Sequence, residues 1–304
     1  MLEDVKKVFE TLDQCCIWSV KLLKIHTTSR EGTTYLAREI ILEPSTAVHE
    51  HVIDIKKKYT DGYNPIFSKY SDLRDYDGTA ENNTIYRLNP EWKLIEENYA
   101  RFSAAMMDCE QEGELLKDKY SAYIISGILN GKPIHLISMH NPFVNVKKKL
   151  ILSDSKFKPV DKPMLSLRTS VDVMIFDDEI YMLSMAGENL FNLERAYKAV
   201  CEYSVTTIID SGILSNIEIF RKIATSKSNP RRFISYNEKY LEKLKNKRIR
   251  GKIAKKFEIP LIDGNFDSET EEASERIVKV LCGKGMLDPF DANPMEVSGS
   301  RIWC

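Results

Sequence analysis

The stretch "SAYIISGILNGKPIHLISMH", residues 121–140, is the strongest fold signal in this chain of 304 residues. Two apolar runs flank Asn130–Gly131, and an Asn-Gly pair between such runs is typical of a two-residue β-hairpin turn. The stretch therefore predicts two antiparallel strands near the middle of the sequence.

Two further pairs of apolar runs predict hairpins on either side of this stretch. Residues 16–26 (CIWSVKLLKIH) and 33–43 (TTYLAREIILE) are rich in branched and aromatic side chains and flank a polar turn. Residues 171–176 and 179–185 flank Asp177–Asp178, and adjacent aspartates suit a tight turn. By contrast, residues 52–83 contain two Asp-Gly pairs and are expected to be rich in loops.

Apolar residues that recur every three to four positions predict the helices. Within residues 237–257 the helical pattern is expected to break near Asn246 or Gly251. The last helix is expected to have Asp267 or Ser268 as its N-cap, because acidic side chains follow in its first turn. The predicted helices cover residues 1–12, 90–110, 192–203, 213–225, 237–257 and 267–283.

The order of these elements predicts an α+β fold. Strands precede helices in each half, and the two do not alternate regularly as they would in a doubly wound sheet. We expect two mixed domains in which β-hairpins pack with helices, and the second is the richer in helix. The lysine- and proline-containing segment Lys147–Pro163 is the expected boundary, which gives an N-terminal domain of residues 1–158 and a C-terminal domain of residues 159–304.

Positive charge is concentrated in one block of the sequence. The whole chain has a formal net charge of −1, yet residues 221–256 carry 14 basic and 2 acidic side chains. Residues 257–304 carry 4 basic and 10 acidic side chains, so an acidic flank follows the block. Between Lys243 and Lys256 there is no acid, whereas solvated helix faces usually interleave acids that pair with the cations. Such a surface favours an acidic partner.

The basic block predicts a site for the phosphate backbone of nucleic acid. It is rich in lysine and contains no motif that reads bases, so contacts to phosphates are expected in place of base readout. An acidic protein, an anionic lipid surface and simple solvation of the helices are the alternatives. Whether Lys147–Lys149 contribute is left open. The candidate residues are Arg231, Arg232, Lys243, Lys245, Lys247, Arg248, Arg250, Lys252, Lys255 and Lys256.

Other features bound the class of protein. The longest run free of Asp, Glu, Lys and Arg is Pro133–Val146, which is shorter than the roughly 20 apolar residues of a membrane span. The N-terminal residues lack the apolar core of a signal peptide, so a cytoplasmic location is expected. Six cysteines show no CxxC spacing and are expected to be reduced thiols.

No sequence motif of an enzyme or of a cofactor site is present, so we expect neither catalysis nor a cofactor. The chain has no Walker loop, GxGxxG, GxSxG or HExxH motif. His49 and His51 would share one face of a strand, but no third metal ligand is nearby. A metal-dependent nuclease is a weaker hypothesis, because Glu179 lacks the lysine two positions later that such sites use. The acids near the hairpin of residues 171–185 are Asp172, Asp177, Asp178 and Glu179.

In the C-terminal half, a strand pair ending in IYML (180–183) precedes an aromatic-bearing helix. A lysine-rich helix ending in KKF-x-I-P (255–260) and a closing LDPF…EV…W (287–303) follow. In these segments the C-terminal half resembles the KwaB component of the bacterial Kiwa anti-phage defence system. The likeness covers roughly residues 160–303 and depends on the order and character of segments, without a catalytic signature.

This resemblance implies a soluble, non-catalytic DNA-binding effector that works with KwaA, a small multi-span membrane protein. It further implies a homodimer or larger oligomer, held at the inner membrane by that partner, that impedes replication and transcription of phage DNA. Within that picture, we expect the acidic flank to limit indiscriminate DNA binding. Neutralising four of its glutamates should then tighten binding; they are Glu269, Glu271, Glu272 and Glu275.

Overall fold

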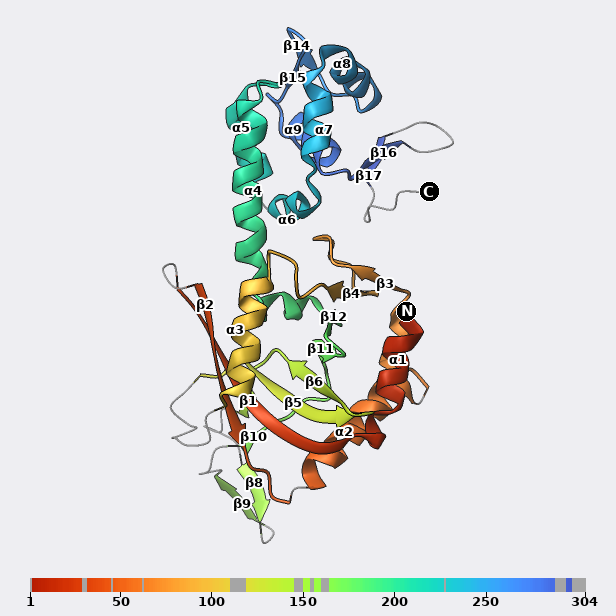
Figure 1. Ribbon diagram of the computed structural model, residues 1–304, viewed down its shortest axis with the longest axis vertical. Helices are drawn as coiled ribbons and strands as arrows, with labels where there is room; N and C mark the ends of the chain where they lie inside the picture. The colour runs from red at the N-terminus through yellow and green to blue at the C-terminus, as the bar shows by residue number, and fades with distance from the viewer. Residues whose placement is uncertain are drawn as a thin grey trace. The chain divides into compact units, whose positions relative to one another are not determined.

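The computed structural model has an α+β fold, as the sequence predicts (Figure 1). The chain folds into two compact units: unit 1 consists of Met1–Asp75 and Glu81–Asn192, and unit 2 of Tyr76–Ala80 and Leu193–Cys304. The structure describes residues 2–28, 32–44, 46–61, 63–109, 119–144, 150–153, 156–159, 164–226, 228–287 and 294–296.

An eight-stranded sheet forms the centre of unit 1, and every neighbouring pair except β3–β4 is antiparallel. The three predicted hairpins are confirmed as β1–β2, β5–β6 and β11–β12. In spatial order the strands are β2 (Gly32–Ile40), β1 (Cys16–Thr28), β5 (Ala122–Leu129), β6 (Lys132–Ser138), β11 (Val173–Phe176), β12 (Glu179–Met182), β4 (Thr84–Leu88) and β3 (Asp72–Asp75).

Two of these hairpins turn over two residues with positive φ. Asn130 has φ 52° and Gly131 has φ 77°, and Asp177 and Asp178 have φ 55° and 60°. Positive φ at both central residues belongs to the turn whose twist matches that of paired strands. The turn interpretation of Asp177–Asp178 is therefore confirmed.

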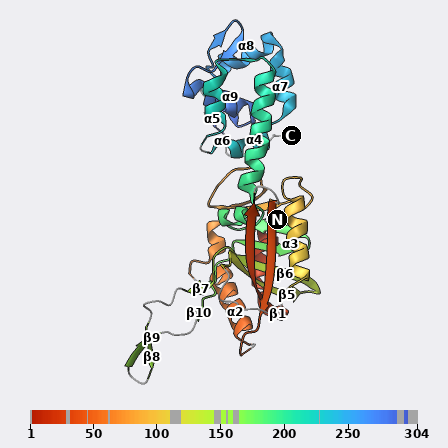
Figure 2. The ribbon, with the colours of Figure 1, turned by 90° about the vertical axis from the view of Figure 1, so that its left-hand side faces the viewer.

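Helices cover both faces of the sheet. Side chains alternate between the faces along each strand, so Leu22 packs with α1 (Leu2–Glu10) and α2 (Thr46–Thr60). Tyr35 points to the opposite face, where its ring meets Phe102 of α3 (Glu96–Met107) at 5.8 Å between centroids. Figure 2 shows α2 and α3 on opposite sides of the β1–β2 pair.

The loop-rich expectation for residues 52–83 is wrong at its start, because α2 continues to Thr60. Val48, Val52, Ile55 and Tyr59 recur at helical spacing and are buried, so packing on the sheet selects the helix.

The domain boundary expected at residues 158–159 falls inside unit 1. The hairpin β11–β12 follows that position in the chain, yet it pairs with β6 and β4 and completes the sheet. Unit 1 also contains the short elements η1 (Leu12–Gln14), η2 (Ile66–Lys69), β7 (Phe143–Val144), β8 (Leu150–Ser153), β9 (Lys156–Pro159), β10 (Met164–Leu165) and η3 (Met185–Asn189).

Unit 2 is mainly helical and has a core of its own, which includes Phe220, Phe233 and Phe266. Its small sheet has the strand order β13-β15-β14. The elements are α4 (Leu193–Asp210), β13 (Leu214–Ser215), α5 (Ile217–Ala224), α6 (Asn229–Arg232), η4 (Phe233–Ser235), α7 (Glu238–Lys245), α8 (Lys247–Lys256), β14 (Leu261–Ile262), β15 (Asn265–Asp267), α9 (Glu271–Leu281), β16 (Gly285–Leu287) and β17 (Pro294–Glu296).

The start of α9 differs from the expectation. Its N-cap is Thr270, whose hydroxyl accepts a hydrogen bond from the Ala273 amide at 3.1 Å. Asp267 is unavailable because it ends strand β15, and Ser268 is buried with its hydroxyl bonded to the Ser215 carbonyl oxygen.

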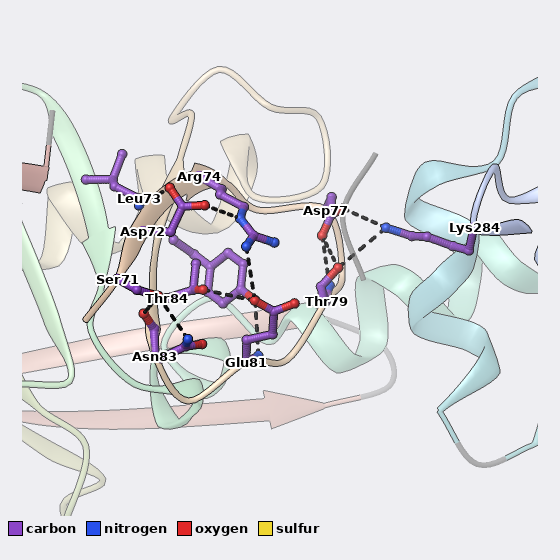
Figure 3. A network of polar contacts seen from close by, with 11 residues as sticks. Ser71, Asp72, Leu73, Arg74, Asp77, Thr79, Glu81, Asn83, Thr84 and Lys284 are labelled. Carbon is purple, nitrogen blue, oxygen red and sulfur yellow. Dashed lines mark hydrogen bonds and ion pairs between the residues drawn. The ribbon is translucent and has the colours of Figure 1, made fainter. Parts of the chain in front are cut away.

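A five-residue piece of the N-terminal half, Tyr76–Ala80, belongs to unit 2. The Ser235 hydroxyl donates to the Asp77 carbonyl oxygen at 3.1 Å. Gly78, with φ 84°, lies so close to Arg231 that a Cβ atom there would be 2.3 Å from the Arg231 carbonyl oxygen. Only glycine fits this close approach of two backbones. Figure 3 shows the side chains of Asp77, Thr79 and Lys284 converging beside it.

Candidate nucleic-acid interface

The helical pattern of residues 237–257 breaks at Asn246, one of the two positions predicted, and Gly251 lies inside α8. The Asn246 side-chain oxygen accepts hydrogen bonds from the amides of Arg248 at 2.9 Å and Ile249 at 3.3 Å. Asparagine competes in this way for backbone donors, so it ends α7 and caps α8 at one position.

Most cations of α8 gather on one side of the helix. Successive residues are about 100° apart around an α-helix, so Arg248, Lys252, Lys255 and Lys256 fall within an arc of about 100°. All four are exposed, whereas Ala254 is buried on the side that faces the core. Lys247, exposed at the first turn, adds a fifth cation to the helix surface.

Six exposed cations form what we call the α8 surface: Lys243 at the end of α7, and Lys247, Arg248, Lys252, Lys255 and Lys256. None of them has an ion-pair partner among the residues that the structure describes. Lys245 differs, because its ammonium lies 2.5 Å from the Glu242 carboxylate. Six uncompensated charges on two adjoining helices repel one another, and a polyanion would relieve that repulsion.

Arg250 does not belong to this surface, which corrects its selection from sequence. It is buried at 3% relative exposure. Its guanidinium donates to the Gly264 carbonyl oxygen at 2.6 Å, the Leu244 carbonyl oxygen at 2.8 Å and the Asn265 side chain at 2.8 Å. Burial lowers the pKa of the guanidinium. Arg250 therefore fixes α8 against the end of α7 and the β14–β15 turn.

Arg231 and Arg232 also lie away from the α8 surface. They end the short helix α6, and Figures 1 and 2 place α6 and α8 at opposite ends of unit 2. Both are half-buried. Arg231 stacks over the ring of Tyr197, 5.4 Å from its centroid, and Arg232 donates to the Asn229 side chain. Lys147–Lys149 lie outside the described residues.

The acidic flank meets the end of α8 through Arg276 of α9. This guanidinium donates to the Phe257 and Glu258 carbonyl oxygens, at 3.3 and 2.9 Å, and lies 2.8 Å from the Glu272 carboxylate. Because residues 257 and 258 directly follow α8, Arg276 and its partner Glu272 lie beside the end of that helix. Glu269, which precedes α9, and Glu271, its first residue, are exposed.

Of the residues considered for a metal or a nuclease site, the two histidines are placed differently from the sequence expectation. His49 and His51 lie on helix α2, about 200° apart around its axis, and share no face. Asp172 accepts hydrogen bonds from the Met139 amide at 2.7 Å and the Ser184 hydroxyl at 2.5 Å. Glu179 binds the Arg87 guanidinium at 3.3 Å. Within the described ranges no three His, Cys, Asp or Glu side chains are grouped to hold a metal ion.

Sequence reasoning missed an apolar recess beside the α8 surface. It has a volume of about 270 Å³, and its lining includes Tyr240 and Lys243 of α7 and Ile249 and Ile253 of α8. The signal was present, because Tyr240 and Leu244, like Ile249 and Ile253, are apolar residues four positions apart. Apolar spacing of this kind is ordinarily explained by packing against the core alone.

No helix of the described chain combines the length and the apolar character that crossing a bilayer requires. In a comparison with known families, the model of the family described as "Kiwa protein KwaB-like" matches residues 117–281, which is more than half of the chain. Searches of curated proteins and of solved structures gave no match.

Proposed function

The chain belongs to the KwaB-like family of the Kiwa anti-phage defence system, and from this premise we propose that it binds DNA through the α8 surface, without sequence preference. By occupying phage DNA it impedes replication and transcription. The observation that carries the proposal is the group of six exposed cations without ion-pair partners in the described chain.

The dimensions of α8 suit a nucleic-acid backbone. Ten residues rise about 15 Å along the helix axis, and that length of duplex DNA carries about nine phosphate charges. Lysine and arginine on this surface would displace condensed counterions, so affinity should fall steeply as salt rises. Contacts of this kind carry no base information and give dissociation constants of about 10⁻⁴ to 10⁻⁶ M.

A single site of this affinity holds DNA weakly, and we propose that assembly of two copies strengthens the binding. A homodimer, held on the cytoplasmic side of the inner membrane by a KwaA-like membrane protein, presents two α8 surfaces together. Linked sites bind with higher avidity without any new contact. A protein that blocks replication and transcription by staying bound to DNA needs no catalytic residue. The protein therefore acts as a non-enzymatic effector in this proposal.

A second candidate function uses the same cations on a different partner. The α8 surface would suit an acidic protein or an anionic membrane equally well in charge, which makes the chain an adaptor. Under this alternative the parent protein has negligible affinity for DNA. Reversing the charges of the α8 surface then abolishes binding of a protein or lipid partner.

The test measures binding of the full chain to a fluorescent duplex at several salt concentrations between about 50 and 300 mM, the range over which phosphate contacts lose most of their affinity. The variant R248E/K252E/K256E reverses the α8 surface, and K57E/K58E/K69E changes the net charge equally at exposed lysines of unit 1. We expect the α8 variant to lose binding and the salt dependence to flatten, while the control variant binds as the parent protein does. Equal binding by both variants, or affinity that does not change with salt, would contradict the proposal.

A further inference from the structure

The apolar recess begins where the cations of α8 end. Arg248 is followed by Ile249 and Lys252 by Ile253, so around the helix two recess-lining isoleucines border the cationic arc. On α7, Lys243 lies in the lining itself. The side chains that give the recess its apolar character are Tyr240, Leu244, Ile249, Ile253, Phe257 and Val280.

Two aromatic rings of the recess lie against glycines. A Cβ atom at Gly283 would be 3.4 Å from Cε2 of Tyr240, and one at Gly285 would be 3.0 Å from Cε1 of Phe257. At both glycines the backbone lies close to an aromatic ring. Tyr240 nevertheless remains 37% exposed and Ile249 39% exposed. Together these exposed apolar groups and the neighbouring cations suit a ligand that has both an apolar face and negative charge.

We propose that this recess receives an unpaired base of a DNA strand whose phosphates lie on the α8 surface. The inference rests on the proposed DNA binding and adds the form of DNA that is bound. Every base has a π-face, so stacking on an aromatic ring is strong and tolerates any sequence. An exposed ring next to phosphate-binding cations supplies both contacts that a single strand offers.

Paired bases cannot make this contact. In a duplex each base is stacked and paired, and extruding one costs unstacking energy. Single strands, frayed ends and gaps present bases that are already free. The protein should therefore hold single-stranded DNA more tightly than duplex at equal phosphate number, and the difference should depend on the ring at position 240.

The experiment compares the full chain bound to an oligothymidylate of about 20 nucleotides and to a duplex of equal phosphate number at about 100 mM salt. Tyr240→Leu keeps apolar packing but removes the π-face, and Tyr240→Phe keeps the ring. Tyr203→Leu is the matched control, because Tyr203 is 66% exposed on α4 of the same unit and is not part of the recess lining. Circular dichroism checks that each variant is folded.

We expect Tyr240→Leu to weaken single-strand binding roughly 5- to 150-fold, as the loss of one stacked base would. Duplex binding should change less than about twofold, and Tyr240→Phe and Tyr203→Leu should bind as the parent does. A 2-aminopurine in the oligonucleotide should be quenched by the parent protein and not by Tyr240→Leu.

Two results overturn the inference while leaving the proposed function intact: salt-dependent binding of both DNA forms that Tyr240→Leu does not alter, or an equal loss for both forms. If the parent protein binds neither form, the proposed function fails first. If vesicles of anionic phospholipid retain the parent protein and Tyr240→Leu abolishes only that retention, the recess serves a lipid and the base assignment is wrong.

Discussion

The Lys284 ammonium lies 2.6 Å from the Asp77 carboxylate, although 207 positions separate the two residues in the chain. The Lys284 side chain is only 5% exposed and Asp77 is also bonded to the Thr79 hydroxyl. Through this pair a short piece of the N-terminal half completes unit 2 (Figure 3). A fragment that begins at residue 159 or 193 would leave a buried lysine without its partner, which is strongly destabilising.

The first prediction concerns that ion pair. Asp77→Asn keeps the shape of the side chain but leaves Lys284 buried and uncompensated, so we expect the free energy of unfolding to fall by about 3–5 kcal/mol. Adding Lys284→Met removes the stranded charge and should recover a large part of the loss. Urea unfolding followed by circular dichroism measures the cycle. If the losses of unfolding free energy in the two single variants add up to the loss in the double variant, the contact does not stabilise the protein.

The same pair should make stability depend on acid. Burial alone would raise the pKa of Asp77, but the bonds from Lys284 and Thr79 outweigh it and hold the pKa below its ordinary value. The stabilisation is therefore present above the unfolded value of about 3.9 and is lost as the pH falls through the lower folded value. Comparing the parent protein with D77N/K284M from about pH 6 to pH 3 should show a difference that shrinks below about pH 4.

Part of this fold can be predicted because its signals are local. The Asn130–Gly131 turn and the cap at Asn246 each depend on residues within a few positions, and both are where the sequence indicates. The sequence likewise predicts that positive charge concentrates on the helices of residues 237–257. Hydrophobic spacing is sufficient for α3, which begins at Glu96 inside the predicted range.

What sequence reasoning missed depends on contacts between distant residues. Arg250 has the same composition around it as Arg248, and only the approach of Gly264 and Asn265 explains why one is buried and the other exposed. The strand order that inserts β11–β12 between β6 and β4 is equally invisible to local patterns. The recess was missed for a related reason: apolar helical spacing does not reveal which face is left uncovered.

The second prediction separates structural from binding arginines. Arg250→Gln removes donors from the Leu244 and Gly264 carbonyl oxygens, so we expect a loss of about 2–4 kcal/mol in the free energy of unfolding. Arg248→Gln, exposed two positions earlier, should change stability by less than about 0.5 kcal/mol but weaken DNA binding. Urea unfolding and the salt-dependent DNA assay measure the two effects. A stable Arg250→Gln protein that has lost only DNA binding would return Arg250 to the interface.

The third prediction uses His135, whose imidazole Nδ1 lies 2.8 Å from the Ser126 hydroxyl on the neighbouring strand. Burial, assisted by the nearby Lys21 ammonium, lowers its pKa to about 4. The folded state then stays neutral while the unfolded state takes up a proton below about pH 6.5, so stability falls as the pH drops from about 6.5 to 4. The total loss is at most about 3 kcal/mol.

His135→Gln should remove this pH-dependent part. We expect the difference in unfolding free energy between the parent and the variant to change steadily between about pH 7 and pH 4.5. His26→Gln, at an exposed site on β1, serves as the matched control for the loss of one imidazole. A difference that stays constant with pH for His135→Gln would show that the imidazole is not held neutral by the fold.

The fourth prediction tests the acidic flank. Glu269 precedes α9 and Glu271 and Glu275 lie in its first half, and this helix contacts the residues after α8 through Arg276. Their charges should repel DNA phosphates near Lys255 and Lys256, so replacing all three by glutamine should tighten duplex binding about 2- to 5-fold at roughly 100 mM salt. Glu272 is left unchanged because it pairs with Arg276. The gain should diminish at about 300 mM salt, where the Debye length is shorter.

The control for this experiment is E43Q/E50Q/E91Q, which removes the same number of charges from exposed positions of unit 1. If tightening came only from the change in net charge, both variants would gain equally. A gain confined to the α9 variant means that the flank acts locally on the α8 surface. No gain in either variant would show that the acids after α8 do not restrain DNA binding.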